Sequence, residues 1–135
     1  MKRIWVYDIE CLISCHTATL LAIDNQEIRQ FVIHKSRNNF SEYIKFLQTE
    51  ISGLIGFNNI NYDYPIIHWI LTKELEWKNM ISKSLTRVTY DKTFDLITNE
   101  IYTKSNEVIE SEWSSIPEWK TIIHQLDLFK IWHFD

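Results

Sequence analysis

The chain has 135 residues, one domain's worth of polypeptide, and its 45% hydrophobic and 24% charged residues are ordinary for a globular protein. It holds only two glycines and two prolines, which excludes a glycine-rich phosphate loop and argues against a linker or a disordered segment. A formal net charge of −4 gives no basic footprint for non-specific nucleic-acid binding. Metal ions can nevertheless neutralise a site lined with carboxylates, so an enzyme acting on nucleic acid stays open.

Cysteine usage and the N-terminus indicate a cytoplasmic protein. No stretch approaches the roughly 18 consecutive apolar residues of a membrane-spanning helix, so no membrane partner is expected. The N-terminal apolar run meets a charge at Asp8, too early for a signal peptide. Cys11 and Cys15 are therefore expected as reduced thiols, and their C-x3-C spacing has no second pair to complete a zinc site.

The first third of the chain predicts three strands that pair as an antiparallel meander. Ile4–Ile9 is a short apolar run rich in aromatic and β-branched residues, which is typical of a buried strand. Cys15–Ile23 and Ile28–Ile33 predict the next two strands, with good turn chemistry at Asp24-Asn25-Gln26 between them.

The hydrophobic period then changes to that of a helix. Apolar residues at helical spacing are Phe40, Tyr43, Ile44, Leu47, Ile51 and Leu54. We expect Asn39 or Ser41 as the N-cap and Gly53 as the end of this helix. A short buried strand, Leu54–Asn58, should follow it.

A second helix is predicted at Tyr64–Lys73, directly after Asp63 and with Pro65 in the first turn, where proline is tolerated. The signal then weakens. Val88–Ile101 has helical character, while 104–119 is polar and has no functional interpretation.

The final predicted element is a strand, Thr121–Leu126, that ends at Asp127. The order of elements indicates an α/β fold, with a mixed sheet and helices on its faces. The whole chain, residues 1–135, is expected to form a single domain.

Asp8 and Glu10 are the informative residues of the first strand. Residues two apart in a strand point to the same face, so the two carboxylates should lie side by side and repel each other. A shared Mg²⁺ or Mn²⁺ resolves that repulsion, because hard divalent ions prefer oxygen ligands. The alternative is that both acids simply end the strand in solvent.

Asp63 adds a third carboxylate to this pattern. It lies at the start of a helix that follows a strand, and parallel pairing of that strand with the first would bring Asp63 near Asp8 and Glu10. The positive end of the helix dipole favours an ionised carboxylate there. A plain N-cap role is the alternative, and it is compatible with metal binding through the other oxygen.

These residues resemble the motifs of a known enzyme family. Val6–Glu10 resembles the first motif of the DEDD 3′–5′ exonucleases, and Gly56–Pro65 is similar to their second motif as found in proofreading domains of phage-type family B DNA polymerases. In that form an Asn five positions before the Asp and an aromatic just before it are typical, and here these are Asn58 and Tyr62. Gln125–Phe129 looks like the segment that precedes the third motif.

The resemblance covers essentially the whole chain and implies a ribonuclease-H-like sheet of five strands, with strands 1–3 antiparallel and strands 4 and 5 parallel. It implies that Asp8, Glu10 and Asp63 hold Mg²⁺ or Mn²⁺ in a two-metal site that hydrolyses the 3′-terminal phosphodiester of single-stranded or frayed DNA. Asn58 and Tyr62 would support the site and the bound strand. The implied setting is the cytoplasm of a bacterium or a phage-infected cell.

The third motif, an Asp preceded by Tyr in Y-x3-D or by His in H-x4-D, is absent from the sequence. We therefore expect a domain that is incomplete at its C-terminus and lacks the last helix of the family. Asp127 and Asp135 are the weaker candidates for the fourth carboxylate.

Three interpretations follow. The last helix is supplied by a second polypeptide or by the rest of a polymerase, or the site is completed in a homo-oligomer. Alternatively, the domain is catalytically silent and binds nucleic acid or protein.

Overall fold

The computed structural model describes residues 2–111, 116–117 and 120–129. Its elements in chain order are β1 (Arg3–Leu12), β2 (Cys15–Ala22), β3 (Ile28–His34), β4 (Arg37–Asn38), α1 (Phe40–Thr49), β5 (Ile51–Gly56), α2 (Asp63–Thr72), α3 (Glu74–Lys83), α4 (Arg87–Glu110) and β6 (Gln125–Asp127). No helix among the described residues has the length and apolar character needed to cross a membrane.

The strands form one mixed sheet in the order β4-β3-β2-β1-β5-β6. β1 and β2, β2 and β3, and β3 and β4 pair antiparallel, whereas β1 and β5, and β5 and β6, pair parallel. The predicted α/β class and the pattern of antiparallel and then parallel strands are confirmed. The two-residue edge strand β4 was not predicted and makes the sheet six-stranded.

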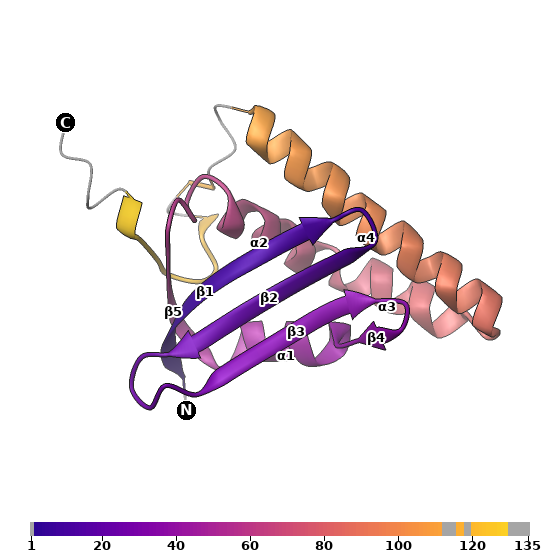
Figure 1. Ribbon diagram of the computed structural model, residues 1–135, viewed down its shortest axis with the longest axis horizontal. Coiled ribbons are helices and arrows are strands. Elements are labelled where there is room, and N and C mark those ends of the chain that lie inside the picture. The colour runs from indigo at the N-terminus through magenta and orange to yellow at the C-terminus, as the bar shows by residue number, and fades with distance from the viewer. Residues whose placement is uncertain (1, 112–115, 118–119, 130–135) are drawn as a thin grey trace.

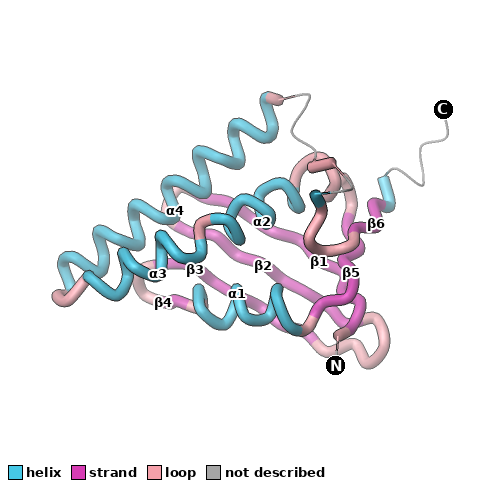
Figure 2. Tube along the Cα trace, turned by 180° about the vertical axis from the view of Figure 1, so that it is seen from behind, coloured by secondary structure: helices cyan, strands magenta, loops and turns pink. Residues whose placement is uncertain are grey.

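Helices cover one face of the sheet. Helices α1, α2 and α3 lie behind the strands in Figure 1 and in front of them in Figure 2. Along β1, Trp5, Tyr7 and Ile9 are buried on the helical side, and the residues between them are exposed. This alternation is the period-two pattern of a strand with one covered face.

The boundary between α1 and β5 was predicted wrongly. The helix ends at Thr49, and Ile51 and Leu54 belong to the strand, with Gly53 in its middle rather than at a helix end. β5 lies between β1 and β6, four of its six residues are buried, and its sequence is nearly continuously apolar. Such a run can continue a helical spacing by chance, and periodicity alone does not distinguish a short buried strand from the end of a helix.

The other corrections concern lengths. β1 continues three residues past the predicted end to Leu12, so Asp8 and Glu10 lie within the strand and do not end it. β6 is confined to Gln125–Asp127, within and just beyond the predicted 121–126. Helix α3 was not predicted, and α4 continues to Glu110, which makes the first part of the unassigned 104–119 segment helical.

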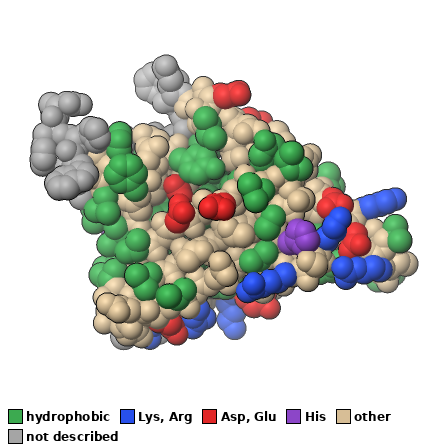
Figure 3. Space-filling view, viewed as in Figure 1, with side chains coloured by type: hydrophobic (Ala, Val, Ile, Leu, Met, Phe, Trp, Pro, Cys, Tyr) green, Lys and Arg blue, Asp and Glu red, His purple; other side chains and the backbone are tan. Residues whose placement is uncertain are grey.

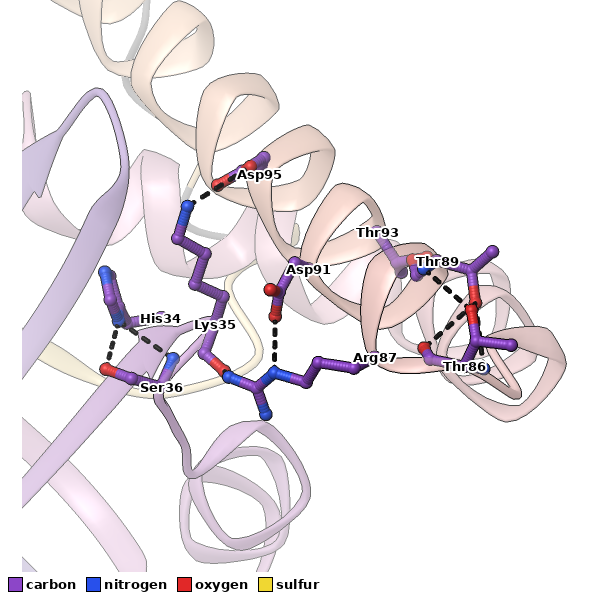
Figure 4. Close-up of polar contacts among 9 residues, drawn as sticks. All are labelled: His34, Lys35, Ser36, Thr86, Arg87, Thr89, Asp91, Thr93 and Asp95. Carbon is purple, nitrogen blue, oxygen red and sulfur yellow. Dashed lines mark hydrogen bonds and ion pairs between the residues drawn. The ribbon is translucent and has the colours of Figure 1, made fainter.

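Polar contacts fix the N-terminal half of α4 beside β3 and β4, as Figure 4 shows. Thr86 and Thr89 form a reciprocal capping box at the start of the helix. Lys35, in the turn after β3, pairs with Asp95 at 3.6 Å, and the Arg87 guanidinium donates to the Lys35 carbonyl at 3.3 Å. These contacts orient the long helix, whose later turns approach β1.

Candidate functional site

Asp8 and Glu10 lie on the face of the sheet that no described helix covers. Both are exposed, and they pair in register with Thr19 and Thr17 of β2. Figure 3 shows acidic side chains near the middle of this face, with hydrophobic side chains around them. Neither carboxylate forms an ion pair with any residue in the described ranges.

The same face carries exposed apolar side chains from four strands. They are Ile4, Val6, Leu12, Leu21, Ile28 and Leu126. An outward-facing antiparallel surface usually presents polar residues to water, so this surface is unusually apolar around its acidic pair.

Asp63 reaches β1 because the neighbouring strand turns away. The pairing between β1 and β5 ends at Val6 and Ile55, which leaves the Ile9 amide without a strand partner on that side. The Asp63 carboxylate accepts the Ile9 N–H through Oδ2 at 3.2 Å. The structure thus brings Asp63 to the strand that bears Asp8 and Glu10, 54 residues away in sequence.

Asp63 is not the N-cap of its helix, which corrects the local alternative. The N-cap is Tyr62, Asp63 is the first helical residue, and no side chain caps the helix. The carboxylate accepts the Ile9 N–H of β1 instead of capping its own helix. Its place in the first turn still benefits from the positive end of the helix dipole.

Burial raises the pKa of the Asp63 carboxyl from 3.8 to about 6. The Ile9 N–H lowers it and the negative charge of Asp8 raises it, with Asp127 adding a smaller rise. Asp63 is 5% exposed, so desolvation is the main cause. A carboxyl that is desolvated beside another acid is a group whose ionised form a bound cation would stabilise.

Tyr62 faces a thiol in the interior. The Tyr62 hydroxyl interacts with the Cys11 thiol, and Ser105 of α4 interacts with both groups. Burial raises the pKa of Cys11 to about 12, so the thiol stays protonated and is no nucleophile near neutral pH. Sequence reasoning missed Cys11 and Ser105 here, and no motif around either residue marks the contact.

The predicted substrate residue Asn58 is half-buried and has a positive φ of 59°. Its neighbour Asn59 is fully buried, and the Asn59 side-chain amide donates to Gln125 Oε1 at 2.8 Å. The Tyr7 hydroxyl donates to the same Gln125 oxygen at 2.9 Å. Asn59 and Gln125 were also missed, because nothing in the Asn58-Asn59 doublet tells which side chain turns inward.

Asp127, a weaker candidate for the fourth carboxylate, is buried and engaged. Its two oxygens accept three backbone N–H groups, which leaves it poorly placed to ligate a metal. Asp135 lies outside the described residues. Within the described part of the chain, no three His, Cys, Asp or Glu side chains are grouped closely enough to hold a metal ion as they stand.

Comparisons of the chain with protein-family models, with curated proteins and with solved structures found no match.

Proposed function

We propose that this chain is a ribonuclease-H-like domain of the 3′–5′ exonuclease type, related to the proofreading domains of phage-type polymerases. It hydrolyses the 3′-terminal phosphodiester of single-stranded or frayed DNA. The observation that carries the proposal is the hydrogen bond from Ile9 to Asp63, which sets a third carboxylate against the strand that bears Asp8 and Glu10. The resemblance of the motifs at Val6–Glu10 and Gly56–Pro65 to those of 3′–5′ exonucleases supports hydrolysis from the 3′ end.

The donor set suits Mg²⁺ or Mn²⁺, since all three side chains offer hard oxygen ligands. Asp63 is fixed by its bond to Ile9, whereas Asp8 and Glu10 are exposed and free of ion pairs among the described residues. Exposed side chains change rotamer within nanoseconds, so both can turn toward Asp63 at small cost. Two bound divalent metal ions would supply an activated water and stabilise the departing 3′-oxygen.

The chain's own residues have separate roles in this proposal. Asp8, Glu10 and Asp63 supply negative charge and oxygen ligands. Tyr62 and Asn58 precede Asp63 in the segment between β5 and α2, and their proposed role is to support the 3′ end of the strand. A rate near that of a complete site requires a fourth acid. We propose that a partner polypeptide, the remainder of a polymerase or a second copy of the chain supplies it, and that the protein acts in the cytoplasm.

A matched pair of variants tests the activity. Glu10→Gln neutralises a proposed ligand, and Glu42→Gln neutralises an exposed glutamate on α1 that forms no ion pair among the described residues. We expect a 5′-labelled single strand with Mn²⁺ to be shortened stepwise by the wild type and by Glu42→Gln, but at least roughly 100-fold more slowly by Glu10→Gln. Equal rates for the two variants would refute the assignment.

One observation favours a second function, a catalytically silent binding module. The apolar side chains that surround Asp8 and Glu10 suit a protein or nucleic-acid surface, and no three acids are grouped for a metal within the described residues. This function predicts DNA or partner binding that is unchanged by EDTA, with no shortening of the labelled strand. Light scattering of the same samples reports whether the bound species is a homo-oligomer.

A further inference from the structure

The carboxylate of Asp127 organises the loop between β5 and α2. Oδ1 accepts the Asn58 N–H at 2.7 Å and the Phe129 N–H at 3.0 Å, and Oδ2 accepts the Ile60 N–H at 3.1 Å. The side chain is 2% exposed, so these bonds lie in a poorly solvated place. A buried carboxylate with three N–H donors is well compensated and holds its donors firmly.

The loop that Asp127 holds is the segment that leads into α2. Asn58 adopts a left-handed conformation with φ 59°, which costs free energy unless contacts maintain it. Its carbonyl accepts the Tyr62 N–H at 3.1 Å, and the Asn59 carbonyl accepts the Tyr64 N–H at 2.8 Å. These two bonds surround Asp63, so the loop and the first turn of the helix form one hydrogen-bonded unit.

A second side chain of β6 acts on the same loop. Gln125 accepts from Asn59 at 2.8 Å and from the Tyr7 hydroxyl of β1 at 2.9 Å. The loop is thereby tied both to β6 and to β1. Gly56 fits the close approach, because a Cβ added there would lie 2.9 Å from the Asn59 side chain.

We propose that Asp127 is a positioning residue: by fixing the loop after β5 it holds Asp63 against the Ile9 amide of β1. Its contribution to metal binding rests on the proposed function, but the positioning itself does not. Among the described residues, the hydrogen bonds of the Asp127 carboxylate all come from backbone N–H groups, and none involves Asp8 or Glu10.

Hydrogen exchange at individual amides tests this directly, because the Ile9 amide reports whether Asp63 is in place. The variants are Asp127→Ala, which removes both acceptor oxygens and with them all three hydrogen bonds, and Asp127→Asn, which keeps one oxygen but turns an N–H₂ donor toward an N–H. Thr98→Val is the matched control, since it removes a buried hydroxyl of α4 that bonds only within its own helix. Exchange is read at Ile9, Asn58 and Ile60.

We expect Asp127→Ala to speed exchange at Ile9 by roughly tenfold or more, in step with Asn58 and Ile60, and Asp127→Asn to have a smaller effect of the same pattern. Thr98→Val should leave the ratio of Ile9 to core amides unchanged. Faster exchange at Asn58 and Ile60 with an unchanged Ile9 would overturn the proposal. If Asp127→Ala does not fold, the same criterion applies to Asp127→Asn.

A Mn²⁺ titration followed by electron paramagnetic resonance separates this inference from the proposed function. Loss of a group that orients a ligand typically weakens metal binding about 10- to 100-fold, and we expect that range for Asp127→Ala relative to Thr98→Val. No Mn²⁺ binding by the wild-type chain would refute the proposed function, while hydrogen exchange at Ile9 would still decide whether Asp127 positions Asp63.

Discussion

Acid should destabilise this protein through His16, which is enclosed in the core. The imidazole is 1% exposed and lies 3.4 Å from the Cys11 sulfur through Nδ1 and 3.3 Å from the Tyr43 hydroxyl through Nε2. Burial lowers the pKa of His16 from 6.5 to about 4. Burial also raises the pKa values of Cys11 and Tyr43, so neither neighbour offers an anion to a protonated imidazole.

The sign follows from proton linkage. Between pH 6.5 and about 4 the unfolded chain carries the proton on His16 and the native chain does not, so stability falls as the pH falls. Since one pH unit is worth about 1.36 kcal/mol, His16 alone should remove roughly 2.5 kcal/mol of the free energy of unfolding between pH 7.5 and 4.5. That is a large share of the roughly 5–15 kcal/mol by which domains are stable.

Urea unfolding followed by tryptophan fluorescence measures this, because the chain has six tryptophans. The comparison is the wild type with His16→Gln, a polar residue that does not titrate, at pH 7.5 and pH 4.5. We expect the variant to be less stable at pH 7.5 but to lose about 2.5 kcal/mol less on acidification. His34→Gln, on the outward side of β3, serves as the control and should keep the full acid loss. Equal losses for the wild type and His16→Gln would refute the reasoning.

Two further predictions concern the loop and its acid. The raised pKa of Asp63 means that its ionisation opposes folding as the pH rises from 3.8 to about 6. Asp63→Asn should therefore stabilise the metal-free protein by about 3 kcal/mol at pH 7.5 and by much less at pH 4, as measured by urea unfolding at both pH values. Gly56→Ala should destabilise the protein by about 1–3 kcal/mol, because the added Cβ would lie 2.9 Å from the Asn59 side chain. Gly53→Ala should cost less, because its Cβ would come no closer than 3.7 Å to another atom. Thermal unfolding of the two variants measures the difference, and equal costs would contradict the steric argument.

The antiparallel part of the fold was predictable because its signals are local. The apolar run of β1, rich in aromatic and β-branched residues, and the polar turn at Asp24–Gln26 between β2 and β3 are both visible in the sequence. The parallel part was harder. β5 is nearly continuously apolar, and β6 has only three residues whose pairing with β5 depends on contacts about 70 residues away in sequence.

The site was predictable to a similar extent. The spacing of Asp8 and Glu10 fixed their common face, and the order of strand and helix suggested that Asp63 would approach them. The partner of Asp63 was not predictable, since the Ile9 amide becomes available only where β5 leaves β1. The same holds for Asp127, whose role lies in three backbone contacts that leave no pattern in the sequence.

The hydrogen-bond requirements of β1 explain why an acid sits at this point of the fold. β2 pairs with β1 as far as Leu12, but β5 pairs only to Val6, so backbone groups of β1 beyond that point need another partner. Asp63 meets that need at Ile9 and takes on a desolvated carboxyl in doing so. Any cation bound there must share the carboxylate with the Ile9 amide, so most of the remaining ligands have to come from Asp8, Glu10 and water.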